Sequence, residues 1–448
     1  MPNITFINHA SVLISDGKDS VLTDPWYDGD ILNNGWRLLY CNDRSYINNV
    51  LDKTSYIWIS HEHPDHFSIK FFNDYKEKIF KNKITLLFQK TKDRRVVNFL
   101  NIKGFKVIEL SENENFYVND NFNIHIKRFG FYDSALIANI GDKKIINLND
   151  CVFENKKELY KFASYEGRAD ILLTQFSYAA WKGGIKNRNW RVKAATEKIS
   201  RIIDQAQALK SKSVIPFASF NYFSNVENFY MNDSINTPQI VREKIEDKKL
   251  PFKLVIMQPG EIQDISNMKQ QNSSLLFWNK RYDHINNFPK YSYEKISYDE
   301  LKLNFLKYQK NIFKNNSKWF MQLISMIPFL NIFKKINIYL HDLNKTISLS
   351  IFEGINISNN ENKYHVKMHS NSLNFIFKNE FGYDTLTANG NFETKKGGFS
   401  KLTKTLSVGS LNSLGYSFSL VLIFKPEIYL LFLNMLTKVS KNLENPYD

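Results

Sequence analysis

Apolar residues in the first half of the chain occur in short runs, which predict buried β-strands. The run at 56 to 59 is rich in β-branched and aromatic residues, as buried strands are. Residues 3 to 26 are predicted to form two strands joined by a turn at 16 to 18. Further strands are predicted at residues 84 to 88, 106 to 110, 122 to 128, 135 to 140, 144 to 148, 171 to 174 and 213 to 217. Apolar residues recur at helical intervals in 67 to 80 and 191 to 209, which predicts helices there.

The pattern changes beyond about residue 261. Residues 266 to 275 are mostly polar and predict a linker. Residues 276 to 448 are predicted to form an α+β domain that binds substrate, lipid or a partner. Its helices are expected at 292 to 314 and 318 to 334, its strands at 347 to 352, 364 to 368 and 373 to 377, and turns with a strand at 381 to 392.

Two apolar stretches in this second region raise the question of a membrane span. Residues 319 to 333 are too short to cross a bilayer, and residues 417 to 436 are interrupted by a Lys-Pro-Glu sequence. A charge pair with proline is costly at the middle of a bilayer. We therefore predict that both stretches form core helices and that neither spans a membrane.

Composition and charge narrow the choice of partners. Lysine and arginine number 60 against 45 aspartate and glutamate, which gives a formal net charge of +15. This balance favours an anionic small-molecule or lipid-linked substrate, or peripheral contact with an anionic membrane surface. The cations are scattered and form no nucleic-acid-binding motif, so nucleic acid is not expected. Only Cys41 and Cys151 occur and the N-terminus leads directly into a strand, so we expect a cytoplasmic protein without a disulfide framework or signal peptide.

One motif in the chain points to chemistry. Directly after the strand at 56 to 59, three histidines and two carboxylates occur within six positions. Imidazole nitrogens and carboxylate oxygens are the ligands that zinc, iron and manganese prefer. His61 and His63 lie two positions apart on extended chain and so point to one side, whereas Asp65 and His66 follow a proline that can turn them toward a second ion. The sequence therefore predicts one or two divalent metal ions, zinc or iron.

The pattern His-x-His-x-Asp-His resembles the signature of the metallo-β-lactamase fold, an αββα sandwich that binds metals at the edge of its sheets. The Asp-Pro-Trp at 24 to 26 and the Gly-Trp at 35 and 36 are similar to the metallo-β-lactamase half of the CMP-N-acetylneuraminate hydroxylase family. This resemblance implies an α/β protein, with a metallo-β-lactamase sandwich over residues 1 to 265 and the smaller α+β domain after the linker.

The resemblance also assigns roles to individual residues. Asp24 would hold a ligand histidine from beneath the metals. Asp150, at the end of a predicted strand, would bridge two metal ions. The implied metal ligands are His61, His63, Asp65, His66 and Asp150.

Two histidines of the usual ligand set of this fold are missing. His125 lies within a predicted strand several residues too early, and Asn225 occupies the place expected for the last histidine. Either one metal binds well, or oxygen ligands complete the set. Asp133 and Glu227 are possible oxygen donors, although we expect surface positions for both.

The other candidate residues are expected around the metals. Asp65 could bind a metal, orient water or take its proton. His9 could bind substrate or donate a proton, and a packed, neutral His9 is the alternative. The side chains predicted to contact substrate are Trp36, Tyr178, Trp181 and Asn225.

Three functions are open at this point. We predict first a metal-dependent hydrolase that uses activated water on an anionic sugar, a nucleotide sugar or a lipid-linked substrate. The second is a non-haem iron oxygenase, as the resemblance implies. It would need an external electron donor, because two distant cysteines cannot build a Rieske cluster in this chain. The third is a metal-stabilised binding protein, which the missing histidines favour.

Overall fold

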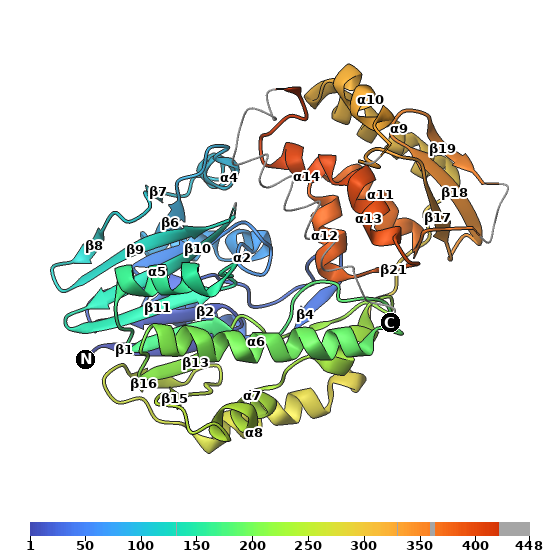
Figure 1. The fold of residues 1–448 in the computed structure, drawn as a ribbon. Helices are drawn as coiled ribbons and strands as arrows, with labels where there is room; N and C mark the ends of the chain where they lie inside the picture. The colour runs from blue at the N-terminus through green and yellow to red at the C-terminus, as the bar shows by residue number, and fades with distance from the viewer. Residues whose placement is uncertain (131, 329, 359–362, 421–448) are drawn as a thin grey trace.

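Two seven-stranded sheets form the centre of the first half of the chain (Figure 1). The computed structural model describes residues 1–448 apart from 131, 329, 359–362 and 421–448. The first sheet has the order β16 (Ile262–Asp264), β1 (Asn3–Asn8), β2 (Ser11–Ser15), β3 (Ser20–Thr23), β5 (Tyr56–Ile59), β6 (Thr85–Gln89) and β7 (Val107–Leu110). The second has the order β15 (Lys253–Leu254), β13 (Ser213–Phe217), β12 (Ile171–Gln175), β11 (Lys143–Asn149), β10 (Asp133–Ile140), β9 (Phe122–Phe129) and β8 (Phe116–Asn119).

Helices cover the outer faces of both sheets. The first sheet shares a hydrophobic cluster with α1 (Arg44–Leu51), α2 (Ile69–Asp74), α3 (Lys76–Lys81) and α4 (Arg95–Ile102). The second shares one with α5 (Lys156–Glu166), α6 (Arg188–Ala208), α7 (Pro238–Glu246) and α8 (Asn272–Asp283). The predicted αββα sandwich is therefore confirmed.

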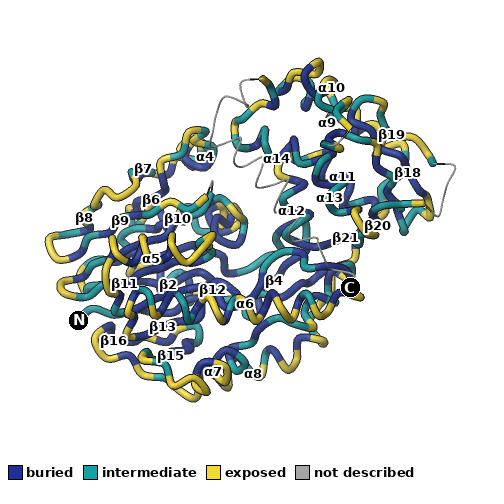
Figure 2. The backbone as a smooth tube through the Cα atoms, in the orientation of Figure 1, coloured by how far each residue is buried: buried dark blue, intermediate teal, exposed yellow. Residues whose placement is uncertain are grey.

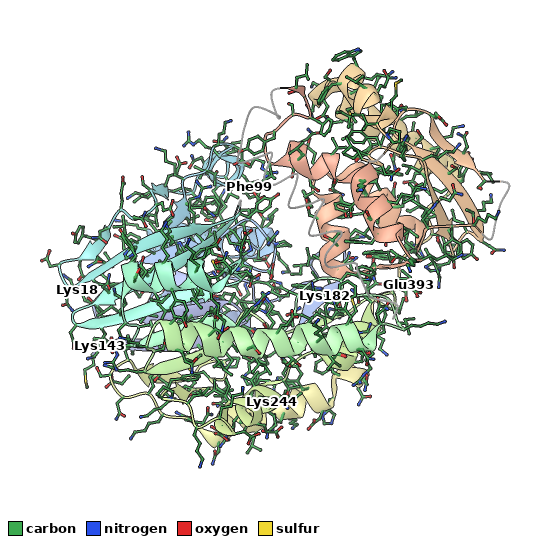
Figure 3. All side chains as sticks on the ribbon, in the orientation of Figure 1. Lys18, Phe99, Lys143, Lys182, Lys244 and Glu393 are labelled. Carbon is green, nitrogen blue, oxygen red and sulfur yellow. The ribbon has the colours of Figure 1, made fainter. Side chains whose placement is uncertain are left out.

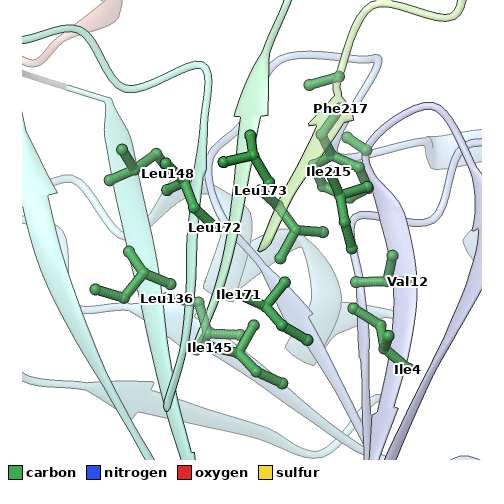
Figure 4. Packing of buried hydrophobic residues seen from close by; sticks show 14 of the residues in the cluster. Ile4, Val12, Leu136, Ile145, Leu148, Ile171, Leu172, Leu173, Ile215 and Phe217 are labelled. Atoms are coloured by element: carbon green, nitrogen blue, oxygen red, sulfur yellow. The ribbon is translucent and has the colours of Figure 1, made fainter. Parts of the chain in front are cut away.

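Alternation of side chains explains why the first sheet is buried on both faces. Successive residues of a strand point to opposite sides. Phe6 and Trp58 belong to the core between the sheets, whereas Ile7 and Ile57 belong to the cluster under the helices. Figure 4 shows apolar side chains of both sheets meeting in the central core, and Figure 2 shows exposure concentrated on the helices and turns.

Two predicted elements of the sandwich are each split in the structure. The first predicted strand is a hairpin, because β1 and β2 are joined by a turn at His9 and Ala10 and pair antiparallel. The helix predicted at 67 to 80 consists of α2 and α3, which are separated at Tyr75.

The segment predicted as a linker, 266 to 275, contributes to the sandwich. Helix α8 begins at Asn272, and Leu275 and Trp278 belong to the main hydrophobic cluster of the sandwich. Trp278 has no exposure, stacks on Phe220 with ring centroids 4.1 Å apart, and donates a hydrogen bond to the Met257 carbonyl at 2.9 Å. The first unit thus extends past the boundary that the polar composition indicated.

The remaining described residues form an α+β unit, as predicted, around a five-stranded sheet. Its strands are β17 (Ile336–Leu340), β18 (Lys345–Ser350), β19 (Gly354–Ile357), β20 (Val366–Met368) and β21 (Phe392–Thr394). Its helices are α9 (Tyr298–Asn315), α10 (Lys318–Met326), α11 (Ser370–Lys378), α12 (Gly382–Asn389), α13 (Gly398–Leu406) and α14 (Val408–Ser413).

Some predicted elements of this unit were wrong. Residues 373 to 377 form part of a helix and not a strand, because Leu373, Ile376 and Phe377 have helical spacing and are buried together. Residues 382 to 389, predicted as turns, are helix α12. Helix α10 ends at Met326 and not near 334, just before a proline that disfavours helix at the preceding residue. The helix predicted at 417 to 436 lies largely outside the described residues. Among those that are described, no helix is long and apolar enough to cross a membrane.

A second hydrophobic cluster joins the two units. The cluster contains Trp36 of the short strand β4 (Trp36–Leu38) and Trp181 of a loop, both from the first unit, together with Phe392 of β21. Backbone hydrogen bonds reinforce the contact, because the Trp181 amide donates to Thr387 at 2.8 Å and the Asn389 side chain donates to Leu32 at 2.9 Å. The second unit therefore packs on the loops that emerge from one end of the sandwich (Figure 1).

We expect Trp278→Ala to destabilise the protein by about 3–5 kcal/mol, because it removes a fully buried indole and its hydrogen bond. Leu276→Ala on the same helix is the matched control, because Leu276 is 67% exposed, and it should change stability by less than about 0.5 kcal/mol. Urea denaturation monitored by fluorescence and circular dichroism measures both. If both variants lowered the free energy of unfolding by the same small amount, α8 would be a linker that is not part of the sandwich core.

Candidate metal centre

The candidate ligands converge because their chain segments end at one edge of the sandwich. The motif follows β5, Asp24 follows β3 and Asp150 follows β11. Asp133 begins β10, which runs antiparallel to β11, and so it lies at the same edge. The loops of an α/β sheet at this edge are where such folds place ligands.

Asp24 organises the motif from beneath. It is fully buried, and its carboxylate accepts hydrogen bonds from the Ser60 amide at 2.7 Å and the Ser60 hydroxyl at 2.8 Å. The same carboxylate lies 2.9 Å from Nδ1 of His66. A proton on that nitrogen leaves Nε2 of His66 free to bind a metal. Asp24 is thus placed as the resemblance implied.

His9 lies beside the motif because it is in the turn of the β1–β2 hairpin. The turn between β1 and β2 holds His9 at a φ of +26°, and the Asn8 side chain accepts its amide hydrogen at 2.9 Å. Nε2 of His9 lies 3.5 Å from Oδ2 of Asp65. Predicting a single long strand concealed this turn, and the tight reversal is what brings His9 beside the motif.

Three groups of side chains have ligand atoms within 4.8 Å of one another. The first is His61, His63 and Asp133; the second is His9, Asp65 and His66; the third is His61, His66 and Asp150. The third group therefore shares His61 with the first group and His66 with the second, and Asp150 lies between them. This arrangement has the form of two neighbouring metal sites with a carboxylate between them.

The distances within these groups are short for charged and polar side chains. Nε2 of His61 and Nδ1 of His63 are 2.8 Å apart. Nε2 of His66 lies 3.3 Å from Asp65 and 3.6 Å from Asp150. Nε2 of His66 and both ring nitrogens of His9 are buried without a hydrogen-bond partner in the described part of the chain. Unpartnered buried donors are costly, and a divalent ion fits this donor set.

The pKa shifts differ from one of these ligands to the next. Burial, and then the nearby His66, lower the pKa of His61 to about 4, so its ring is neutral and can bind metal. Burial alone would lower the pKa of His66, but Asp65 and Asp150 raise it well above its usual value. Burial, and then Asp150, raise the pKa of Asp133 to about 6. Clustered carboxylates repel one another here, and a bound cation would relieve that repulsion.

Asp133 is the site residue that the sequence analysis undervalued. A surface position was expected, but its carboxylate lies 3.7 Å from Nε2 of His61. In the sequence, the signal that could have identified Asp133 as a ligand was its position at the start of a buried strand. The other suggested oxygen donor, Glu227, pairs instead with His341 of the second unit at 2.9 Å. His125 pairs with Glu166 at 3.0 Å and belongs to none of the ligand groups.

The predicted substrate-binding side chains lie in packing positions in this structure. Trp36, Tyr178 and Trp181 are at most 5% exposed and belong to the cluster that joins the units. Trp181 stacks on Phe392, with ring centroids 4.6 Å apart. Asn225 is fully buried and accepts a hydrogen bond from the Glu227 amide at 3.0 Å. Stacking on a substrate ring needs an open face, so these side chains do not offer one here.

The fold of the first unit is the metallo-β-lactamase fold. Residues 3–218 match the family model of a beta-lactamase superfamily domain. Among solved structures, the chain is similar to Igni18, a metallo hydrolase from Ignicoccus hospitalis, with 16% identity, a TM-score of 0.39, and 58% of this chain and 97% of that one covered. It is also similar to CmlA, a diiron β-hydroxylase from Streptomyces venezuelae, with 13% identity, a TM-score of 0.41, and coverage of 57% and 52%.

The curated relatives are hydroxylases. The chain is 23% identical over 283 residues to the cytidine monophosphate-N-acetylneuraminic acid hydroxylase of Danio rerio, covering 59% of this chain and 46% of the relative. It is 24% identical over 249 residues to that of Xenopus laevis, covering 52% and 40%. The chain therefore spans less than half the length of these relatives, and the N-terminal unit is related to the hydroxylase half that the sequence resembles.

We expect His61→Ala/His63→Ala to lose most bound metal and Asp133→Asn to weaken metal binding by about 10–100-fold, because each removes ligands of the first group. Glu227→Gln is the control, because Glu227 contacts His341 and no ligand. Elemental analysis after dialysis against a graded chelator series measures retention. Wild-type retention in Asp133→Asn would show that Asp133 is not a ligand.

Proposed function

We propose that this chain is a metal-dependent hydrolase that acts on an anionic sugar, a nucleotide sugar or a lipid-linked anion. The observation that carries the proposal is the pair of ligand groups with Asp150 between them. Pairs of metal sites at short separation are used for hydrolysis by stabilising both the attacking and the leaving oxygen. Zinc or iron are the candidate ions, and His61, His63, Asp65, His66, Asp133 and Asp150 are the residues that would hold them, with His9 beside Asp65.

The protein side chains supply orientation and proton transfer. A bound divalent ion would supply Lewis acidity and lower the pKa of water at the site. Burial would raise the pKa of Asp65, but His66 and His9 hold it well below its usual range, so Asp65 is a carboxylate. From 3.5 Å, His9 can pass a proton between Asp65 and a leaving group. In hydrolysis one water oxygen enters the product, and the leaving group takes the proton.

Cations beside the site support an anionic substrate. Nζ of Lys198 on α6 donates a hydrogen bond to Gln175, and Gln175 donates to Asp150 at 3.1 Å. Lys198 also interacts electrostatically with Lys182 and Arg201. Three cations grouped near the metal end of the sandwich favour a substrate that carries phosphate or carboxylate.

A second candidate function is that of an iron-dependent oxygenase, and Asp133 is the observation that favours it. With His61 and His63 it makes a group of two histidines and one carboxylate, the ligand set of non-haem iron oxygenases. The names of the curated hydroxylase relatives point the same way. Such chemistry would need electrons from another protein, because Cys41 is exposed and Cys151 buried and the two cannot form a Rieske cluster.

Isotope labelling separates the two functions. Using CMP-N-acetylneuraminate and other anionic nucleotide sugars as probes, we expect cleavage with one oxygen atom taken from ¹⁸O-labelled water. Asp65→Asn should lower turnover by about 10² or more, because water loses its orienting base. Label from ¹⁸O₂ that appears only with a reductant would overturn the hydrolase proposal and establish the oxygenase. Metal binding without turnover under either condition would favour the binding protein.

The pH dependence of substrate affinity tests the role of Lys198. Burial lowers its pKa to about 8 although Asp150 opposes the shift, so Lys198 is cationic below that pH and neutral above it. We expect KM for an anionic substrate to rise as pH passes about 8. Lys198→Met should raise KM about tenfold at pH 7, the equivalent of about 1.4 kcal/mol, and remove this dependence.

Lys193→Met is the matched control for that variant, because Lys193 is an exposed lysine on the same helix. It should leave KM and its pH profile unchanged. Persistence of the KM rise above pH 8 in Lys198→Met would exclude Lys198 as the group responsible.

A further inference from the structure

A large cavity lies at the opposite end of the sandwich from the metal centre. It has a volume of about 890 Å³ and forms where β11, β12 and β13 begin, next to the C-terminal ends of α5 and α6. Lys143 marks this end of the sandwich in Figure 3, and Lys182 marks the other. Gln175, at the metal end, lies four positions after the first residue of β12, which is about 13 Å at the usual rise of a strand.

The wall of this cavity is cationic. It carries five cationic side chains and one carboxylate, that of Asp170. The five are Lys143, Arg168, Lys210, Lys212 and Lys253. Lys212 pairs with Asp170, and Lys143 pairs with Asp142. The two ion pairs leave three unpaired cations, and the C-terminal ends of α5 and α6 add about half a negative charge each, which leaves about two net positive charges.

Three of these cations are available to a ligand. The side chains of Arg168, Lys210 and Lys253 are exposed and make no ion pair or hydrogen bond with other described residues. Like charges that line one cavity without partners repel one another, and a multiply charged anion would remove that repulsion. An arginine beside two lysines suits a phosphate group, because guanidinium and ammonium both form charge-assisted hydrogen bonds with phosphate oxygens.

The rest of the lining mixes apolar and uncharged polar residues. Leu250, Phe252, Ile265 and Met268 contribute to the wall. Ser211 also lines the cavity, and its buried hydroxyl has no hydrogen-bond partner in the described chain. A volume of about 890 Å³ is within the usual range of small-molecule sites. The size of the cavity, its apolar residues and the unpartnered hydroxyl of Ser211 together fit a ligand larger than an inorganic ion.

We propose that this cavity binds the phosphate of a partly apolar organic molecule. Arg168, Lys210 and Lys253 hold the phosphate, and the wall at Phe252 and Met268 covers the apolar or ring-bearing part. The phosphate belongs either to a free metabolite such as a nucleotide or to the headgroup of an anionic lipid. The site is independent of the hydrolase proposal, because none of its residues belongs to the ligand groups of the metal centre.

Direct binding to the full chain tests the site. The probes are inorganic phosphate, adenosine 5′-monophosphate and phosphatidylcholine vesicles with or without phosphatidic acid, studied by calorimetry and by vesicle sedimentation. The variant is Arg168→Glu/Lys253→Glu, and Lys18→Glu/Lys244→Glu is the control with the same number of charge reversals at exposed lysines that do not line the cavity (both labelled in Figure 3). Metal content is measured in parallel and should be the same in all three proteins.

We expect an organic phosphate, free or in vesicles, to bind wild type and the control alike and the cavity variant at least about tenfold more weakly. Tighter binding of the nucleotide than of inorganic phosphate identifies a free metabolite, and binding only to phosphatidic acid vesicles identifies the lipid headgroup. No binding of any probe, equal weakening in the control, or binding of inorganic phosphate as tight as that of both organic forms would overturn the proposal.

Discussion

The carboxylate of Asp24 lies at the end of β3 without exposure to solvent, held by the amide and hydroxyl of Ser60 and by the ring of His66. Through these contacts it fixes the start of the metal motif and the orientation of a ligand in a single arrangement. Leaving such buried donors unpaired costs about 1–3 kcal/mol for each group. The carbonyl of Ser60 is held as well, because Gln89 and Ser134 both donate to it. The motif is thus fixed by the neighbouring strands rather than by its own loop.

That fixed frame allows the site to concentrate charge. Asp65, Asp133 and Asp150 bring three carboxylates to one edge of the sandwich, and two buried histidines contribute nitrogens without hydrogen-bond partners. In water such a group would separate or take up protons. Here the sheets prevent separation, and burial together with the neighbouring Asp150 raises the pKa of Asp133. A divalent ion satisfies both kinds of donor at once, which is why the donor set itself is the strongest argument for a metal centre.

The second unit changes what the metal end of the sandwich can present. Its strand β21 and helix α12 pack on the segments that carry Trp36 and Trp181, and they cover rings that an isolated sandwich would expose. In the proposed hydrolase, a substrate at this end would meet residues of both units, and Lys198 would be the cationic contribution of α6. The basic cavity at the other end is formed by the sandwich alone, so the two ends can bind different anions without sharing a residue.

The sequence by itself determined the strand pattern of the sandwich and the motif His61 to His66, because strand periodicity and ligand spacing are local properties. It also placed Asp24 and Asp150, through a resemblance whose residues occur in the right order. Local patterns failed at helix α11, where Leu373 and Ile376 suit a helix as well as a strand, and at α8, whose polar beginning concealed the buried Trp278. Only the tertiary structure brought His9 and Asp133 to the ligands and buried the aromatic rings between the units. Those contacts join segments that are far apart in the chain. Strand pairing decides which segments meet, and the local spacing of residues does not encode that pairing.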